Sequence, residues 1–199
     1  EGPHNVGAKR NHGAEIATGS IFLFIDSDCS VHPDWLKIHR DAHDRHPEAA
    51  AFAGLIELAG ERSFVGEAVE RQGSFTAAFR FANWTPTVDW ASTANLSIKK
   101  DAFHAIGGFD TSMPDIIYGE DVDFGIRLTK DNYSIISLPQ AIVYHPPNTI
   151  NSLKTSFVKS FRCGKADTWL QRRHPGRRHP ALPEPVLLFL TWGIVVAFS

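Results

Sequence analysis

The feature that most limits how this chain can fold is an uninterrupted apolar run, Ile21 to Ile25, that ends in the acidic triplet Asp26-Ser27-Asp28. A continuous apolar run is typical of a buried strand in a parallel sheet, and open α/β sheets bind ligands at the carboxyl ends of such strands. Alternate side chains of an extended backbone share a face, so Asp26 and Asp28 are expected to point the same way. Two carboxylates there suit a divalent cation that bridges to phosphate. The alternative is that one Asp caps the following turn while the other is solvated.

Helical and strand patterns alternate along the first 150 residues. Helices are expected over 5–18, 32–46, 64–81, 101–106 and 119–130, and strands over 21–25, 50–58, 95–98, 134–138 and 141–145. This alternation predicts a single α/β domain over residues 1–150, with helices on the faces of a sheet.

Composition places the chain among ordinary globular proteins. Hydrophobic residues make up 43% and charged residues 21%, and the formal net charge of -2 gives no reason to expect nucleic-acid binding. Cys29 and Cys163 are far apart in the sequence, which favours a reducing compartment over a disulfide framework. The chain begins at Glu1 rather than Met, so we expect it to be a fragment whose start is missing.

The C-terminal part has a different charge pattern. Residues 151–180 carry eight Lys and Arg residues against the single acid Asp167, and residues 185–199 carry no charge. We expect 151–184 to form a basic helical juxtamembrane segment and 185–199 to begin a transmembrane helix, because basic residues commonly flank a span on its cytoplasmic side. The alternative is a buried C-terminal helix or strand.

A second acidic cluster opens the helix expected at 119–130. A helix N-terminus carries partial positive charge, so Asp121 is expected to stay ionised, as a general base requires. The alternative is simple capping, with Asp123 and Arg127 forming a surface ion pair.

Five blocks occur in the order found in family 2 glycosyltransferases, and the chain resembles that family, whose members have the GT-A fold. The blocks are Ala8–Gly13 with Ala17 and Gly19, Phe24–Asp28, Ala94–Ile98 followed by Ile106–Asp110, Gly119–Phe124, and Val143–His145. The resemblance covers roughly residues 5 to 145. It implies a Rossmann-like mixed sheet flanked by helices, with the N-terminal nucleotide-binding part missing.

The resemblance also implies roles for the acidic clusters. Asp26 and Asp28 would hold Mn²⁺ or Mg²⁺ on the diphosphate of a nucleotide sugar, which acts as a Lewis acid toward the leaving group. Asp121 would deprotonate the acceptor hydroxyl, with Glu120 as a neighbouring acceptor contact, and the anomeric carbon would be inverted. His145 matches a third metal ligand in some members, although a His at a strand end can also be a polar cap.

Further residues are assigned to the two substrates. Arg10 and Asn11 match a segment that contacts the nucleotide, and otherwise they belong to an exposed helix face. Candidate acceptor contacts are Trp90, which could stack on a sugar ring, and Asn95, Gly107 and Gly108. The alternative for Trp90 is an ordinary core position.

The expected acceptor is a hydroxyl of a glycan, a lipid, or another cell-envelope or secondary-metabolite molecule, and the expected location is the cytoplasmic face of a membrane, such as a bacterial cell membrane. Gln171-Arg172-Arg173 is not followed by the Trp of the processive synthase motif, which favours transfer of one or a few sugars. Two alternatives remain at this point. One is a haloacid dehalogenase-type phosphatase with Asp26 as nucleophile. The other is a catalytically inactive, membrane-associated binding module.

Overall fold

The computed structural model describes residues 5–73, 77–112, 118–148 and 150–176. The chain divides into two compact units, one made of residues 1–61 and 76–147 and the other of residues 62–75 and 148–199. Within the described ranges no helix is both long and apolar enough to cross a membrane. The apolar segment at 185–199, where a span was expected, lies outside the described residues.

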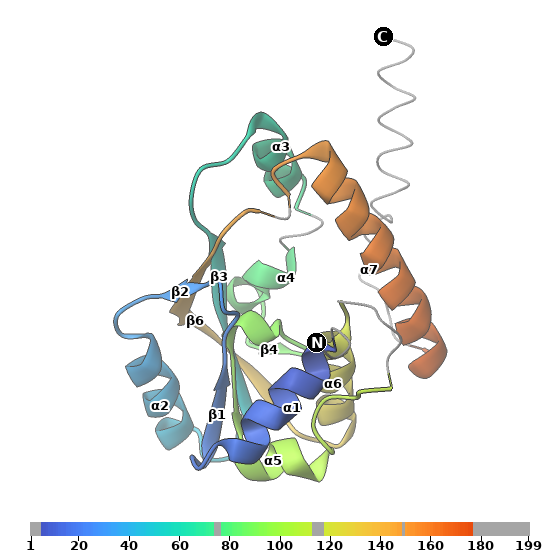
Figure 1. Cartoon of the computed structure of the whole chain (residues 1–199). Helices are drawn as coiled ribbons and strands as arrows, with labels where there is room; N and C mark the ends of the chain where they lie inside the picture. The colour runs from blue at the N-terminus through green and yellow to red at the C-terminus, as the bar shows by residue number, and fades with distance from the viewer. Residues whose placement is uncertain (1–4, 74–76, 113–117, 149, 177–199) are drawn as a thin grey trace. The chain divides into compact units, whose positions relative to one another are not determined.

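The first unit contains a mixed sheet (Figure 1). The strands are β1 (Ile21–Phe24), β2 (Ser30–Val31), β3 (Ala51–Leu58), β4 (Thr87–Val88), β5 (Leu96–Lys99) and β6 (Ile135–His145). Their order is β1-β5-β3-β6-β2, and β4 pairs with β6. The two strands expected at 134–138 and 141–145 form the single strand β6.

β1 is not the parallel strand that its apolar sequence predicts. It pairs antiparallel with β5, which in turn pairs antiparallel with β3; among the described strands only β3 and β6 pair in parallel. Phe22 is the one fully buried residue of β1. The apolar run reflects aromatic packing instead, since the rings of Phe22 and Phe24 lie 5.4 and 5.8 Å from that of Phe103. The sheet is therefore mixed, as the GT-A resemblance implied.

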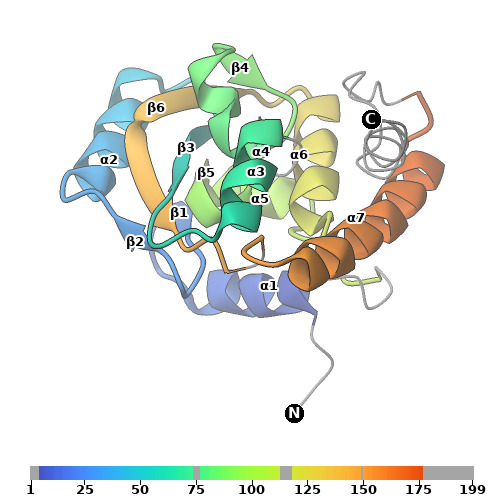
Figure 2. The same ribbon diagram turned by 90° about the horizontal axis from the view of Figure 1, so that it is seen from above.

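Helices cover both faces of this sheet (Figure 2). α1 (Val6–Ile16), α5 (Lys100–Ala105) and α6 (Glu120–Lys130) supply Ala14, Phe103 and Phe124 to the core on one face. α2 (Trp35–Arg45) supplies Trp35 and Ala42 to the core on the other face. Short helical turns occupy α4 (Ala77–Arg80), η1 (Phe81–Asn83) and η2 (Thr93–Asn95).

The second unit contains α3 (Phe64–Gln72) and α7 (Leu153–Arg173). The helix expected over 64–81 is wrong, because α3 ends at Gly73. Gly73 has φ +81°, a left-handed conformation that glycine adopts readily and that commonly ends a helix. Ser63 begins α3 by accepting a hydrogen bond from the backbone N–H of Gly66.

A buried amide side chain occupies a break in the pairing of β3 with β6. Gly54 lies opposite Leu138 but Leu55 lies opposite Ile142, so three residues of β6 are left out of the register. The Asn95 amide enters at this point and donates to the carbonyls of Leu55 and Ala141, each at 2.8 Å. Any side chain at Gly54 would collide with the Asn95 amide.

Two buried histidines extend this network between α2 and the sheet. His39 contacts Asn95 Oδ1 through Nε2 at 3.1 Å and Ser97 Oγ through Nδ1 at 2.9 Å. His43 Nε2 lies 3.0 Å from the same Ser97 hydroxyl, and Trp35 donates to Asn95 Oδ1 at 2.8 Å. Burial lowers the pKa of His39 and of His43 to about 4, so both rings are neutral near pH 7.

Replacing Asn95 by Ala should destabilise the protein strongly. The change leaves two backbone carbonyls, Trp35 Nε1 and His39 without their buried partner, and we expect a loss of about 3 kcal/mol or more. Urea unfolding measures the loss. Asn83→Ala, at an exposed position of η1, is the control and should change stability by less than about 0.5 kcal/mol. Equal stability of the two variants would contradict the structural role of Asn95.

Acid should unfold the protein through the buried histidines. Each ring has a pKa of about 4 when folded and 6.5 as a free group, so the unfolded chain binds more protons between these values. Stability should be complete above about pH 6.5 and fall by up to roughly 3 kcal/mol for each ring as the pH approaches 4. Urea midpoints across this range test it. His43→Gln should flatten the dependence, whereas His12→Gln, an exposed control, should leave it as steep as in the parent protein.

Candidate active site

The acidic triplet lies in a turn rather than on a strand. β1 ends at Phe24, and the N–H of Cys29 donates to the carbonyl of Asp26 at 3.1 Å. The two carboxylates, which were expected to share one face of a strand, therefore lie in a turn and have different partners. Asp26 pairs with Arg10, and Asp28 lies beside Cys29.

Strand pairing brings His145 to the second of these carboxylates. β2 starts just after the turn and pairs antiparallel with the end of β6, with Ser30 opposite Tyr144. Continuing that register places Cys29 beside His145. Ligand atoms of Asp28, Cys29 and His145 lie within 4.8 Å of one another. Asp26 is not part of this group, although the sequence interpretation made it a metal ligand.

The donor atoms of this group differ in their readiness to bind a cation. His145 Nδ1 lies 2.7 Å from the carbonyl of Pro146, which can only accept, so the neutral ring carries its proton on Nδ1 and leaves Nε2 with a lone pair. Burial, followed by the charges of Asp26 and Asp28, raises the pKa of Cys29 to about 12. The group therefore offers a carboxylate and an imidazole, which suit Mn²⁺, together with a protonated thiol.

Arg10 connects the two acidic clusters. Its Nη2 lies 3.0 Å from Asp26 Oδ1 and its Nη1 lies 2.5 Å from Glu120 Oε1. The Arg10 side chain is 15% exposed and that of Glu120 is 10% exposed, so solvent screens this pair weakly. The guanidinium was expected to contact diphosphate; in this structure it joins the end of β1 to the start of α6.

Asp121 has a higher pKa than its helix position predicts. It lies in the first turn of α6 and accepts from the N–H of Val122 at 2.8 Å, which favours the charged form. Burial and the neighbouring charge of Glu120 outweigh this bond and the opposing effect of Arg10, and raise the pKa of Asp121 to about 7. The helix N-terminus was expected to keep Asp121 ionised, and in the structure burial and Glu120 act against the charged form. A carboxyl that titrates near neutral pH is nevertheless well suited to general-base work.

Asn11 was expected to contact the nucleotide, but in the structure its side chain binds the backbone of Phe109. Its amide donates to the carbonyl of Phe109 at 2.8 Å and accepts from the N–H of Phe109 at 2.9 Å, so both polar atoms are used within the protein. Gly107 and Gly108 have φ +76° and +66°, which confirms the backbone freedom inferred for them. The close approach at Gly108 is to Asn11 and Phe103, inside the protein. Gly107 is exposed and has open space around it.

Arg127 is a residue whose role the sequence interpretation missed. It pairs with Asp123 at 2.8 Å and donates to the carbonyls of Ile106 and Gly108, each at 2.7 Å. Asp123 is fully buried, so the expected surface pair is an interior one. The four-residue spacing of Asp123 and Arg127 was visible in the sequence. The turn whose carbonyls Arg127 binds lies in a distant segment, around Ile106 and Gly108, and no local pattern indicates that contact.

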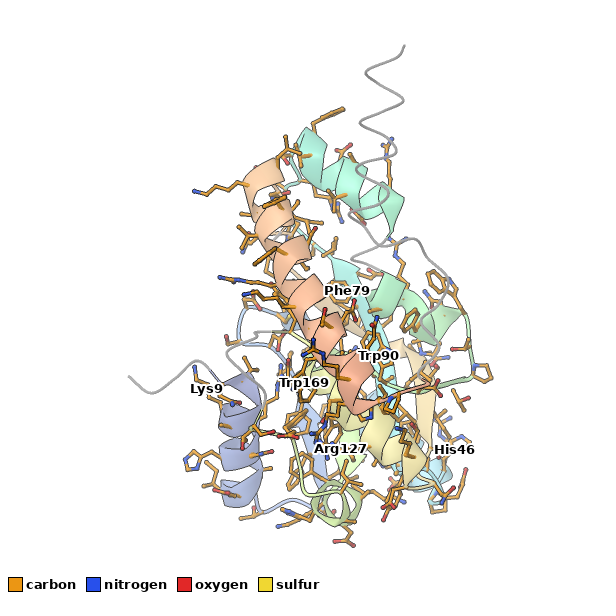
Figure 3. All side chains as sticks on the ribbon, turned by 90° about the vertical axis from the view of Figure 1, so that its right-hand side faces the viewer. Lys9, His46, Phe79, Trp90, Arg127 and Trp169 are labelled. Atoms are coloured by element: carbon orange, nitrogen blue, oxygen red, sulfur yellow. The ribbon has the colours of Figure 1, made fainter. Side chains whose placement is uncertain are left out.

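Two residues assigned to the acceptor are packed inside the protein to different degrees. Asn95 is 1% exposed and all its polar atoms have partners within the sheet, so an acceptor contact is wrong for it. Trp90, which Figure 3 labels, is half-buried. Its ring lies edge-on to Phe81 at 5.6 Å, and its backbone packs against Gly125 of α6.

The model of a family described as glycosyl transferase family 2 matches residues 1–107. Glycosyltransferase AglE of Haloferax volcanii is 31% identical over 181 residues, which are 88% of this chain and 55% of AglE. A glucosyl-dolichyl phosphate glucuronosyltransferase of the same organism is 27% identical over 54% of this chain and 35% of the relative. An N-acetylglucosaminyl-diphospho-decaprenol L-rhamnosyltransferase of Mycobacterium tuberculosis is 33% identical over 50% of this chain and 32% of the relative.

A solved structure of GalNAc-T7 with UDP, GalNAc and Mn²⁺ superposes with a TM-score of 0.52 at 13% identity, covering 71% of this chain and 30% of GalNAc-T7. At this identity the likeness concerns the fold, which is GT-A. The chain spans about half the length of AglE and about a third of the other two relatives. The family match favours sugar-transfer chemistry over the phosphatase alternative. On the match of more than half its length, the chain belongs to glycosyl transferase family 2.

Proposed function

We propose that this protein transfers a sugar from a nucleotide-sugar donor to an acceptor hydroxyl, with divalent-metal dependence and inversion at the anomeric carbon. The observation that carries the proposal is the Arg10 bridge. A single guanidinium contacts Asp26, in the triplet that contains Asp28, and Glu120, the neighbour of Asp121. Donor-side and acceptor-side groups therefore lie close enough to act on one substrate pair.

Asp28 and His145 fit the ligand set of Mn²⁺ or Mg²⁺, the former better because of the imidazole. Asp26 lies outside that group, and it would be a weaker second acidic ligand because Arg10 already balances its charge. When bound, the metal would neutralise the diphosphate leaving group. Arg10 carries a further positive charge that can pair with diphosphate oxygens.

Asp121 accepts the proton of the acceptor hydroxyl, and Glu120 keeps Arg10 beside it. Its pKa of about 7 means that a large fraction is deprotonated at neutral pH, while the carboxylate is still basic enough to remove a proton. Trp90 and Gly107 are the remaining acceptor contacts in this proposal. A catalytically inactive module would have the same fold but no turnover, which the experiments below distinguish.

The proposed acceptor is a sugar linked to a lipid phosphate or diphosphate. Two relatives are named for a dolichyl phosphate and a decaprenol diphosphate substrate, and the basic residues of 151–180 are suited to a phosphate-bearing lipid. The proposed location is the cytoplasmic face of a cell membrane.

Removing Asp28 or His145 should weaken metal-dependent nucleotide binding. Calorimetric titration with UDP and GDP, each with and without Mn²⁺, should show at least about a tenfold loss of Mn²⁺-dependent affinity for Asp28→Ala and His145→Ala. Asp26→Ala should lose less. The control is Asp34→Ala, an exposed carboxylate near the same turn. Unchanged Mn²⁺-dependent affinity in the Asp28→Ala, His145→Ala double variant would reject the metal assignment.

The base assignment predicts a particular pH profile. Because the reactive form of Asp121 is deprotonated, kcat/KM should rise with pH through a midpoint near 7. Arg10→Gln should move this midpoint upward, since the guanidinium lowers the pKa of Asp121. Asp121→Asn should slow turnover by about 10² to 10⁴ while nucleotide binding survives.

Asp131→Asn, at the other end of α6, is the control for the charge change and should keep the parent profile. Near-normal turnover by Asp121→Asn would transfer the base role to another group. A midpoint that does not respond to Arg10→Gln would show that the titrating group lies elsewhere.

A further inference from the structure

The unit formed by α3 and α7 presents large apolar side chains to solvent. Phe64, Leu153, Phe157 and Phe161 are between 58% and 87% exposed. The three residues of α7 recur every fourth position, so they form one stripe along the first half of the helix. Large apolar side chains gain free energy when they leave water, so a row of exposed ones indicates a surface that binds something apolar.

α3 carries Phe64 as its first residue, and it begins beside the start of α7. Ser63 Oγ donates to the carbonyl of Asn151 at 2.6 Å, and the N–H of Ser63 donates to Asn151 Oδ1 at 3.2 Å. Ser152 and Thr155 form a capping box that fixes the first turn of α7. The apolar stripe is thus anchored at one end by hydrogen bonds rather than carried by a loose segment.

Basic side chains border the stripe. α7 carries six Lys and Arg residues and a single acid, Asp167. At 3.6 residues per turn, Lys154 and Lys165 lie about 20° and 40° around the helix from Phe161. The Lys165 Nζ lies 5.0 Å from the Phe161 ring centroid, and the Arg173 guanidinium lies 5.0 Å from the ring of Trp169, which Figure 3 labels.

We propose that the α7 stripe of Leu153, Phe157 and Phe161, with Lys154 and Lys165 beside it and the exposed Phe64 at the start of α3, lies in the interface of an anionic lipid bilayer. Aromatic rings beside ammonium groups match the two layers of such an interface: the rings enter the boundary with the acyl chains, and the ammonium groups meet the phosphates. A second copy of this chain is a poorer occupant, because a two-fold contact would bring identical basic residues together.

The surface is distinct from the uncharged residues 185–199 and acts by docking rather than by spanning. Its test measures lipid contact, not sugar transfer, so this inference and the proposed function can fail separately.

A local probe distinguishes this face from any other attachment. In the full chain, with Cys29 and Cys163 replaced by Ser, a nitrobenzoxadiazole dye is attached to Phe157→Cys or to Phe161→Cys. The matched controls carry the dye at Ile16→Cys or Leu36→Cys, two exposed apolar positions of the first unit. Each protein is mixed with phosphatidylcholine vesicles with or without phosphatidylglycerol, and quenching by spin-labelled lipid is measured.

The dye at 157 and 161 should be quenched in vesicles that contain phosphatidylglycerol and remain unquenched in pure phosphatidylcholine, with no quenching at 16 or 36. Lys154→Gln with Lys165→Gln should weaken binding at least about tenfold at low salt. Protein that floats with the vesicles while the dye at 157 and 161 stays unquenched would overturn the proposal. So would a concentration-dependent blue shift without vesicles, which would identify a second copy as the occupant.

Discussion

The arrangement of the acidic site depends on the charge of Arg10. Without its guanidinium, the negative charges of Asp26 and of the largely buried Glu120 would be unbalanced, and the pKa of Asp121 would rise further. Its position is fixed by the adjacent residue, because Asn11 fastens α1 to the backbone of Phe109, whose ring centroid lies 5.7 Å from the Arg10 guanidinium carbon. Consecutive residues of one helix thus set the geometry and the electrostatics of the site together.

The sequence predicted those parts of the fold that depend on local patterns. The helices α1, α2, α5 and α6 and the strands β3 and β5 lie where periodicity and turn residues indicated, within a few residues. The direction of β1 was wrong, because an apolar run reports burial and aromatic packing but not the orientation of the neighbouring strand. The helix expected over 64–81 failed at Gly73, a single residue whose left-handed backbone ends it.

For the candidate site too, the sequence predicted the residue types but not their partners. The acidic motifs were visible as residue types, and so were His145 and Arg10. Their partners were not, because a pairing such as Arg10 with Glu120 joins residues 110 positions apart. Asn95 was assigned to the acceptor from its motif, yet its buried contacts come from α2, β3 and β6 at once. The pKa of Asp121 is likewise set by surroundings that no local spacing records.

The three residues that β6 leaves out of register affect which side chain lies near Asp28 and Cys29. Had β3 and β6 kept the pairing that begins with Ala51 opposite Ile135, Leu58 would face Ile142, an aliphatic residue without a donor atom. With the interruption it faces His145. The Asn95 amide therefore works as a spacer inside the sheet. By occupying the interruption, it shifts the register of β6 against β3, and this shift brings the imidazole of His145 to the end of the strand near Asp28. In a chain of this kind, changing the number of residues in the interruption would alter which chemical group arrives at the active site while leaving every ligand in the sequence intact.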